Sequence, residues 1–435
     1  MPPADSGRRD REERSVALRV ILASIGSAGD VHPFVAVALG LRDRGHLVSV
    51  ATNPYFAPLL DRLGLPLLPV GTAEQFDEAI AHPALWRQFR AFGVLATIIR
   101  YSTPMLHRIV KEEAAKGDIA VVAHPLAFGA RVAHETLGVP LVTLHLAPSS
   151  IWSLRKPPVP SQWIGSIDAW PRLARRLFLG LGDRLADRAL APSLNRFRAE
   201  FGLAPARHVA SRWWNSPQCA IGLFPDWFAA PQPDWPSQLS LTGFPLYDEQ
   251  GVSQVPSDLE VFLGEAETAG DPPIVFAPGS SNRQAKRFFA AAAEACQRLG
   301  RRGVLLTRYA EQLPSRLPSQ VRHTSYAPFS AVFPRAAALV HHGGIGTAAQ
   351  ALAAGRPQLV MPMTFDQPDN AARLVGLGVA RMLAPARFSG TNVARQLSAL
   401  LEDDLVRRRC TEIAHRFDSN DAIARTCDLI EASIT

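Results

Sequence analysis

The sequence predicts an α/β protein with two doubly wound parallel-sheet domains. The chain has 435 residues, more than one hydrophobic core normally holds, so two domains are expected. Short β-branched, apolar segments alternate with amphipathic helical segments in both halves, an order typical of parallel sheets covered by helices. Glycine-bearing turns follow several of the expected strands, at the sheet edge where such folds bind ligands.

The first half begins with a strand expected over 17–24, which ends at the turn 26–29. A helix is expected over 33–44, with Pro33 in its first turn and Gly45 after its end. The later elements expected in this half are strands over 46–51, 67–69, 119–123 and 141–144, and a helix over 54–63. We therefore assign an N-terminal domain to 17–241.

The second half has the same rhythm without repeating the sequence. Its expected strands cover 274–277, 303–307, 338–341 and 358–361, and its expected helices cover 288–299, 346–354 and 368–377. We expect a linker over 242–257 and a C-terminal domain over 258–415. The final segment, 416–435, is expected to be a helix that crosses back to the N-terminal domain.

Composition limits the possible partners and the compartment. The net charge of +7 and a pI near 9.6 suit an anionic ligand or an anionic membrane surface. No nucleic-acid-binding signature occurs, so we expect no nucleic acid partner. Four scattered cysteines favour the reducing cytoplasm. Residues 1–16 are polar and resemble a disordered tail, and no apolar run is long enough to span a bilayer. Peripheral attachment to the inner membrane and a partner subunit stay open.

Two glycine-bearing loops in the second half are candidates for phosphate binding. A strand-to-helix turn exposes backbone N–H groups at the positive end of a helix, where phosphate binds. The candidate residues of these loops are Gly279, Ser280, Ser281, His341, Gly343, Gly344, Gly346 and Thr347. Asp366 and Gln367 follow the next expected strand at the same edge. Alternatively, the glycines only permit tight turns and His341 is a structural histidine.

Asp30 is the candidate catalytic base, in the loop Gly-Ser-Ala-Gly-Asp-Val-His-Pro that ends at Pro33. A hydroxyl acceptor needs a positioned base, and a carboxylate can serve. His32 is the rival base. A second reading makes Asp30 a helix N-cap, which is compatible with the catalytic role. No D-x-D motif occurs, so we expect no metal; the helix dipole and His341 would then neutralise the leaving group.

An apolar acceptor pocket is expected in the N-terminal domain. The helical region 81–108 carries apolar residues at mixed three- and four-residue spacing, more than one core stripe requires. Together with the tryptophan-rich region after Leu146, it gives the candidate acceptor residues Phe89, Phe92, Leu95 and Trp152. Arg87, Arg90 or Arg155 could pair with an acceptor carboxylate. Alternatively, this helix is simply buried on two sides.

Tyr326-Ala327-Pro328, the later H-x-G-x-x-G-T and then D-Q resemble the donor signature of family 1 GT-B glycosyltransferases. The resemblance covers the chain beyond its tail. It implies the GT-B fold, two Rossmann-like domains facing a central cleft, and inverting sugar transfer from a nucleotide-sugar without metal or cofactor. It implies that Tyr326 stacks on the nucleobase beside Ala327, that Ser280, His341, Gly346 and Thr347 hold the diphosphate, and that Asp366 and Gln367 bind sugar hydroxyls. Phe329 and Gly344 depart from plant-type members.

The segment 216–248 is most similar to the bacterial rhamnosyltransferase subunit of rhamnolipid biosynthesis. This likeness implies dTDP-L-rhamnose as donor and a 3-(3-hydroxyalkanoyloxy)alkanoate as acceptor, giving a mono-rhamnolipid. His32 and His342 depart from that relative. The alternatives are a UDP- or dTDP-sugar transferase acting on a sterol, macrolide or other lipophilic acceptor, a non-catalytic sugar-nucleotide-binding partner subunit, and a phosphorylase or epimerase.

Overall fold

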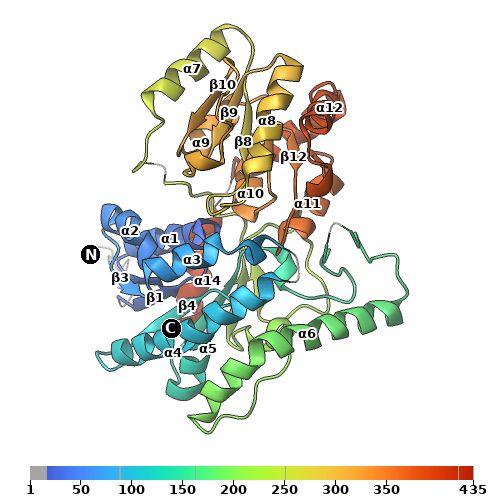
Figure 1. Ribbon diagram of the computed structural model, residues 1–435. Helices are drawn as coiled ribbons and strands as arrows, with labels where there is room; N and C mark the ends of the chain where they lie inside the picture. Colours follow the sequence, from blue (N-terminus) through green and yellow to red (C-terminus); the bar gives the residue numbers. More distant parts are fainter. Residues whose placement is uncertain (1–16, 88–89, 162, 250, 420, 435) are drawn as a thin grey trace, which may run out of the picture.

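The computed structural model describes residues 17–87, 90–161, 163–249, 251–419 and 421–434. Two parallel sheets form the centres of two α/β domains, drawn one above the other in Figure 1. The N-terminal sheet has seven strands in the order β3-β2-β1-β4-β5-β6-β7, and the C-terminal sheet has six in the order β10-β9-β8-β11-β12-β13. This confirms the predicted fold class.

Among the described residues, the N-terminal domain contains the strands β1 to β7, the helices α1 to α6 and one π-helical turn. The strands are β1 (Arg19–Ala23), β2 (Leu47–Thr52), β3 (Leu67–Pro69), β4 (Ala120–Ala123), β5 (Leu141–His145), β6 (Cys219–Gly222) and β7 (Leu239–Leu241). The helices are α1 (Ala28–Asp43), α2 (Ala57–Leu63), α3 (Ala73–Ala81), α4 (Ala91–Ala114), α5 (Phe128–Leu137), α6 (Arg172–Ala199) and the π-helical turn η4 (Val209–Trp213). The sequence did not predict β6 or β7.

The C-terminal sheet comprises β8 (Ile274–Ala277), β9 (Gly303–Leu306), β10 (Val321–Thr324), β11 (Ala338–His341), β12 (Gln358–Val360) and β13 (Ala380–Met382). The later helices are α7 (Ser257–Thr268), α8 (Lys286–Leu299), α9 (Phe329–Val332), α10 (Ile345–Ala353), α11 (Gln367–Gly376), α12 (Gly390–Leu401), α13 (Asp404–Ala414) and α14 (Ala422–Ile434). Single-turn 3₁₀ helices occupy Pro54–Phe56, Pro83–Trp86, Pro148–Ser150, Ala310–Gln312, Phe333–Arg335, Pro385–Arg387 and His415–Phe417. Here β10 and β13 were not predicted.

The strand β1 shows why these short apolar segments form buried parallel strands. Side chains of a strand alternate between the two faces of its sheet. Val20 and Leu22 accordingly pack in one core, and Ile21 and Ala23 pack in the core on the other face. Both faces are covered, so the strand is apolar throughout instead of alternating with polar residues.

The helix α14 packs against α1 of the N-terminal domain (Figure 1). Gly40 of α1 permits this approach, because a Cβ atom there would lie 2.7 Å from Ile423 and 3.0 Å from Cys427. Arg44 at the end of α1 is 2.7 Å from Asp428 and 2.8 Å from Glu431. The end of the described chain therefore lies on the N-terminal domain. Within the described residues, no helix is long and apolar enough to cross a membrane.

Two helix boundaries differ from the sequence-based expectation. The helix α1 begins at Ala28, not Pro33, because Ser27 serves as its N-cap and Asp30 completes a capping box with it. Pro33 lies inside the helix. The region 81–108 is not one helix: α3 ends at Ala81 and α4 begins at Ala91.

Candidate active site

A cavity of about 1100 Å³ lies between the two domains and is lined by residues from both. The loops after β1 and β4 contribute to its N-terminal wall, and the loops after β8, β10 and β11 contribute to its C-terminal wall. Ligands of parallel α/β sheets bind at these carboxyl ends. The sequence-predicted residues in its wall are Asp30, His32, Phe92, Leu95, Trp152, Gly279, Ser280, Ser281, Tyr326, Ala327, Gly344, Gly346, Thr347, Asp366 and Gln367.

Asp30 is fixed at the start of α1, with its carboxylate at the cavity. The Ser27 backbone N–H donates to Asp30 Oδ2 at 2.7 Å, and the Ser27 hydroxyl donates to the same oxygen at 3.2 Å. Asp30 is therefore the third residue of the helix and not its N-cap. Burial raises the pKa of Asp30 to about 6, although both Ser27 donors oppose the rise. At neutral pH the carboxylate is mostly ionised and able to accept a proton.

Gly26 is required by this arrangement. Its φ of +147° lies in a region that side chains rarely adopt, and a Cβ atom there would lie 2.2 Å from Asp30 Oδ2. The glycine of the loop therefore makes room for the carboxylate.

His124, which directly follows β4, faces Asp30. Its Nε2 lies 3.9 Å from Asp30 Oδ1, and its Nδ1 accepts the Leu126 N–H at 3.3 Å. The neutral ring thus carries its proton on Nε2, toward Asp30. Burial lowers the pKa of His124 to about 4, so it is neutral when Asp30 is ionised. The sequence-based prediction did not include His124, although this residue directly follows the strand expected over 119–123, and ligands bind at the carboxyl ends of such strands.

His32 is directed toward the linker. Its Nε2 lies 3.4 Å from Glu249 Oε1, and its ring meets Tyr247 edge-on with centroids 5.6 Å apart. Glu249 is buried and also accepts a hydrogen bond from Arg62 at 2.8 Å. This geometry favours Asp30 over His32 as the base and makes His32 part of an interdomain contact.

The two glycine-bearing loops of the C-terminal domain meet at His342. A Cβ atom at Gly279 would lie 3.1 Å from the His342 ring, and one at Gly344 would lie 2.5 Å from it. Gly344 is also the N-cap of α10, whose first backbone N–H groups point out of the helix. His342, Gly346 and Thr347 line the cavity beside these groups. The arrangement suits an anion at the helix start.

His341 and Gly343 lie outside the cavity wall, contrary to the sequence-based expectation for diphosphate binding. His341 is fully buried: its Nε2 bonds Gln358 Oε1 at 2.9 Å, and its Nδ1 accepts the Gly343 N–H at 3.1 Å. Burial lowers the pKa of His341 to about 3, so it cannot supply a cation near neutral pH. Both ring nitrogens are used inside the domain, which fits the alternative reading of a structural histidine.

Tyr326 lies in the cavity wall but is held by the linker. Its hydroxyl donates to the Asp248 carbonyl at 2.7 Å, and the Arg308 guanidinium lies over its ring at 5.3 Å. Burial raises the pKa of this hydroxyl, so it stays protonated. The ring is therefore fixed in place, with one face covered by a cation.

Asp366 and Gln367 follow a turn in which Phe365 has φ +56°, a strained value for a bulky residue. Asp366 accepts from Asn370 Nδ2 at 2.6 Å. Burial, reinforced by the charge of Asp30, raises the pKa of Asp366 to about 7. The Gln367 amide oxygen accepts the Met363 N–H at 2.9 Å, which leaves its NH₂ group for a ligand. Two acids from opposite domains, Asp30 and Asp366, thus line the same cavity.

The N-terminal wall of the cavity is largely apolar. It includes Phe92 and Leu95 of α4 and Trp152, while Phe89 lies outside the described residues. Further apolar residues in this wall are Trp86, Ile98, Tyr101, Ile164, Phe178, Leu181 and Leu185. Of the arginines proposed for an acceptor carboxylate, none lines the cavity. Among the described residues, the wall instead contains Arg188 and Arg308.

Comparison with known proteins agrees with this geometry. Residues 20–151 match the glycosyltransferase family 28 N-terminal domain, and residues 303–427 match the C-terminal domain of erythromycin biosynthesis protein CIII-like proteins. The chain is 30% identical over 431 residues to glycosyltransferase GtfE of Amycolatopsis orientalis, covering 96% of this chain and 98% of that protein. The chain belongs to the GT-B glycosyltransferases.

Other similar proteins also carry glycosyltransferase names. O-mycaminosyltylonolide 6-deoxyallosyltransferase of Streptomyces fradiae is 29% identical over 428 residues, covering 95% of this chain and 97% of that one. The glycosyltransferase of kitacinnamycin has a TM-score of 0.71 at 22% identity, covering 96% and 100% of the chains. Glycosyltransferase VinC in complex with dTDP has a TM-score of 0.67 at 21% identity, covering 96% and 99%. This glycosyltransferase therefore groups with antibiotic-type relatives.

Proposed function

We propose that this glycosyltransferase transfers L-rhamnose from dTDP-L-rhamnose to the hydroxyl of a 3-(3-hydroxyalkanoyloxy)alkanoate, giving a mono-rhamnolipid. The proposal rests chiefly on one observation, that a single cavity joins the two halves of the site. Its wall contains apolar side chains of α4 and α6, the Asp30 carboxylate and the glycine-bearing loops proposed to bind phosphate. Burying alkyl chains against such a wall contributes about 0.8 kcal/mol per methylene. The donor and acceptor identities rest on the resemblance of segment 216–248 to the rhamnolipid enzyme.

The proposed reaction is one displacement at the anomeric carbon. The acceptor oxygen forms a bond to that carbon while its proton passes to the Asp30 carboxylate. The bond from that carbon to the diphosphate oxygen breaks, and the diphosphate leaves with the electron pair. Backbone N–H groups at the start of α10, together with Ser280 and Thr347, stabilise the negative charge that develops on the leaving diphosphate. A single displacement inverts the anomeric configuration.

A macrolide-type acceptor is the second candidate. It is favoured by the names of the relatives, one of which glycosylates a tylonolide and spans 95% of this chain. A cavity of about 1100 Å³ also suits a bulky aglycone. A non-catalytic partner subunit is disfavoured, because the candidate base and the phosphate loops are both present.

A crossed panel of donors and acceptors tests the proposal. Purified protein is incubated with dTDP-rhamnose, dTDP-glucose or UDP-glucose, each with a hydroxyalkanoyloxy-alkanoate or a macrolide aglycone, and products are identified by mass spectrometry. We expect rhamnosylated hydroxy acid as the main product. Exclusive glycosylation of the macrolide would overturn the lipid acceptor, and release of nucleoside diphosphate without any product would leave only donor binding.

A further inference from the structure

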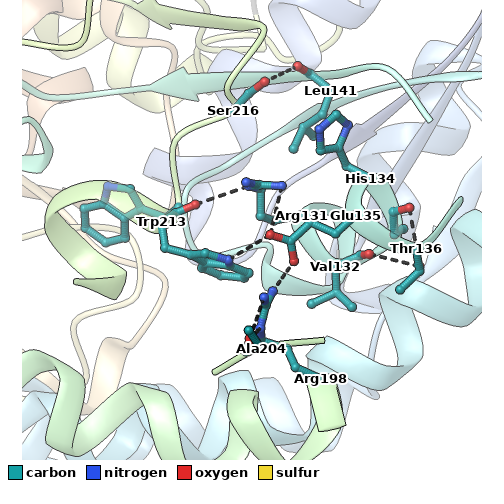
Figure 2. A network of polar contacts seen from close by, with 12 residues as sticks. Arg131, Val132, His134, Glu135, Thr136, Leu141, Arg198, Ala204, Trp213 and Ser216 are labelled. Atoms are coloured by element: carbon teal, nitrogen blue, oxygen red, sulfur yellow. Dashed lines mark hydrogen bonds and ion pairs between the residues drawn. The ribbon is translucent and has the colours of Figure 1, made fainter. Parts of the chain in front are cut away.

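The long helix α6 has an anchored half and a free half. Its C-terminal half packs in the core through Leu190 and Leu194. Figure 2 shows the polar network behind that packing, in which Glu135 of α5 pairs with Arg198 of α6 and accepts the Trp213 indole N–H at 3.2 Å. The N-terminal half, residues 172–182, contains no buried side chain among the described residues. In Figure 1 this end of α6 projects away from the rest of the domain.

A strip of exposed leucines runs along this free half. Leu173, Leu177, Leu181 and Leu185 are 68%, 65%, 54% and 57% exposed. Residues four apart lie one above the other on a helix, so the four side chains form one apolar strip. Contiguous exposed apolar surface of this kind is uncommon on soluble proteins and marks an interaction site.

Among the described residues, the exposed charged side chains of α6 are all arginines. Arg172, Arg176, Arg184 and Arg188 lie between and beside the leucines, and all four are exposed. The acids of α6 point the other way: Asp183 pairs with His208, and Asp187 accepts the Val209 N–H at 2.8 Å. No acidic side chain belongs to the exposed residues of α6 in the described structure. The face therefore combines an apolar strip with uncompensated positive charge.

Tryptophans extend this face before the helix begins. Trp163 is 70% exposed and Trp170 is 39% exposed, with the Trp170 ring packed edge-on against Phe178 of α6 at 5.5 Å. Tryptophan favours the boundary between water and hydrocarbon, because its ring is apolar and its N–H is polar. Ile164, Leu181 and Leu185 are exposed and also line the cavity. The strip is thus continuous with the acceptor side of the cavity.

We propose that this face, made of 163–170 and the N-terminal half of α6, docks on an anionic lipid bilayer. Leucines and tryptophans enter the boundary region while the arginines pair with headgroup phosphates, as in interfacial amphipathic helices. A bilayer fits better than a protein partner, because a row of uncompensated arginines interleaved with leucines matches a layer of phosphates above hydrocarbon. Docking places the cavity mouth against the lipid phase, from which an alkyl acceptor can enter.

Vesicle sedimentation of the full chain tests this proposal. The probes are phosphatidylcholine vesicles with and without phosphatidylglycerol. We expect strong binding only to the anionic vesicles, weakened by salt. The variant Leu173→Gln/Leu177→Gln changes side chains outside the cavity wall and should reduce vesicle binding about tenfold or more. The matched control Val261→Gln/Leu405→Gln, altering side chains 63% and 56% exposed on α7 and α13, should bind as the wild type does.

Two outcomes would overturn the docking proposal. One is equal binding of the wild type and Leu173→Gln/Leu177→Gln to anionic vesicles. The other is a wild-type dimer in light scattering that this variant makes monomeric without any change in vesicle binding, which would assign the strip to a second copy of the chain. Neither readout involves sugar transfer, so failure here is separate from failure of the proposed function.

Discussion

Asp30 is held by the first turn of the helix that carries it. The Ser27 donors orient the carboxylate, and His124 faces its second oxygen at 3.9 Å. A half-buried acid with a pKa of about 6 is a stronger base than a free aspartate and is still mostly ionised at neutral pH. The capping-box contacts of Asp30 are therefore compatible with its proposed role as the base.

Replacing Asp30 by asparagine should reduce sugar transfer about 100-fold or more, the usual scale for a general base. Because burial disfavours the ionised form, the raised pKa means that Asp30 destabilises the fold increasingly as pH rises from about 3.8 to about 6, and fully above that. Asp30→Asn should therefore not lower the melting temperature at pH 7. In the wild type, kcat/KM should rise as pH increases through about 6. Near-normal turnover in Asp30→Asn, with an inactive His32→Ala, would move the base to His32.

The two adjacent histidines should respond differently to replacement by alanine. His342→Ala should weaken binding of the nucleoside diphosphate by one hydrogen bond, about 0.5–1.5 kcal/mol, without affecting the bare nucleoside. His341→Ala should instead lower stability by about 1–3 kcal/mol, because Gln358 and the Gly343 N–H lose a buried partner. Calorimetry with the nucleoside diphosphate and with the nucleoside measures the binding effect expected of His342→Ala. Denaturant unfolding measures the loss of stability expected of His341→Ala. A diphosphate-specific loss in His341→Ala alone would restore the sequence-based assignment.

Much of the residue-level site was predictable, but its finer geometry was not. Asp30 and the glycine-bearing loops could be predicted from short sequence patterns, because each loop is a glycine-bearing turn between an expected strand and an expected helix, and the first such turn contains an acid. Which of His341 and His342 points into the cavity depends on side-chain direction at the end of a strand, where alternate residues face opposite sides. His124 pairs with Asp30 across two neighbouring strands, and sheet order cannot be read from one strand.

The helix α4 of the N-terminal domain lines part of the cavity with apolar side chains. Phe92 is 43% exposed and lines the cavity, whereas Ile99 of the same helix is fully buried in the core. One side of this helix therefore packs in the core and the other borders the cavity, and binding of alkyl chains by that second side stays a prediction. The sequence did not predict that α4 begins at Ala91, because the apolar pattern continues through Pro83–Trp86, which forms a separate 3₁₀ turn.

Replacing Phe92 by alanine should affect long acceptors most. Loss of its burial against alkyl chains is worth roughly 1–2 kcal/mol, so KM for the longest hydroxy acids should rise about 5- to 30-fold while short ones change little. Phe201, 41% exposed and outside the cavity wall, is the matched control. A uniform effect across chain lengths, or an equal effect of Phe201→Ala, would contradict an alkyl-binding role for α4.

Ion pairs and hydrogen bonds join the two domains through the linker. Glu249 contacts Arg62 and His32 of the N-terminal domain, and Arg308 of the C-terminal domain lies 4.0 Å away. Burial alone would raise the pKa of Glu249, but His32, Ser253 and Arg308 hold it below its ordinary value. The sequence indicated two domains from rhythm alone. It could not indicate this contact, in which Glu249 and Arg62 lie 187 positions apart in the sequence.

Glu249→Gln should lower the free energy of unfolding by about 1–3 kcal/mol at pH 7, since it removes a buried charge from its partners. A depressed carboxylate pKa stabilises the fold above the unfolded value, and that contribution is lost as pH falls through the folded value. The difference between wild type and variant should therefore shrink in acid. Glu412→Gln, which breaks an exposed pair with Arg409, is the control and should cost under about 1 kcal/mol. Equal losses in both variants would contradict a special role for the linker.

A comparison of product formation by the wild type and Asp30→Asn tests the proposed transfer reaction and the role of Asp30 together. Each protein is given dTDP-L-rhamnose and a hydroxyalkanoyloxy-alkanoate, and product is quantified by mass spectrometry while dTDP affinity is measured by calorimetry. We expect rhamnosylated product from the wild type, a loss of about 100-fold or more in Asp30→Asn, and little change in dTDP affinity. A wild type that binds dTDP but glycosylates no acceptor, or a variant that keeps the wild-type rate, would contradict these expectations.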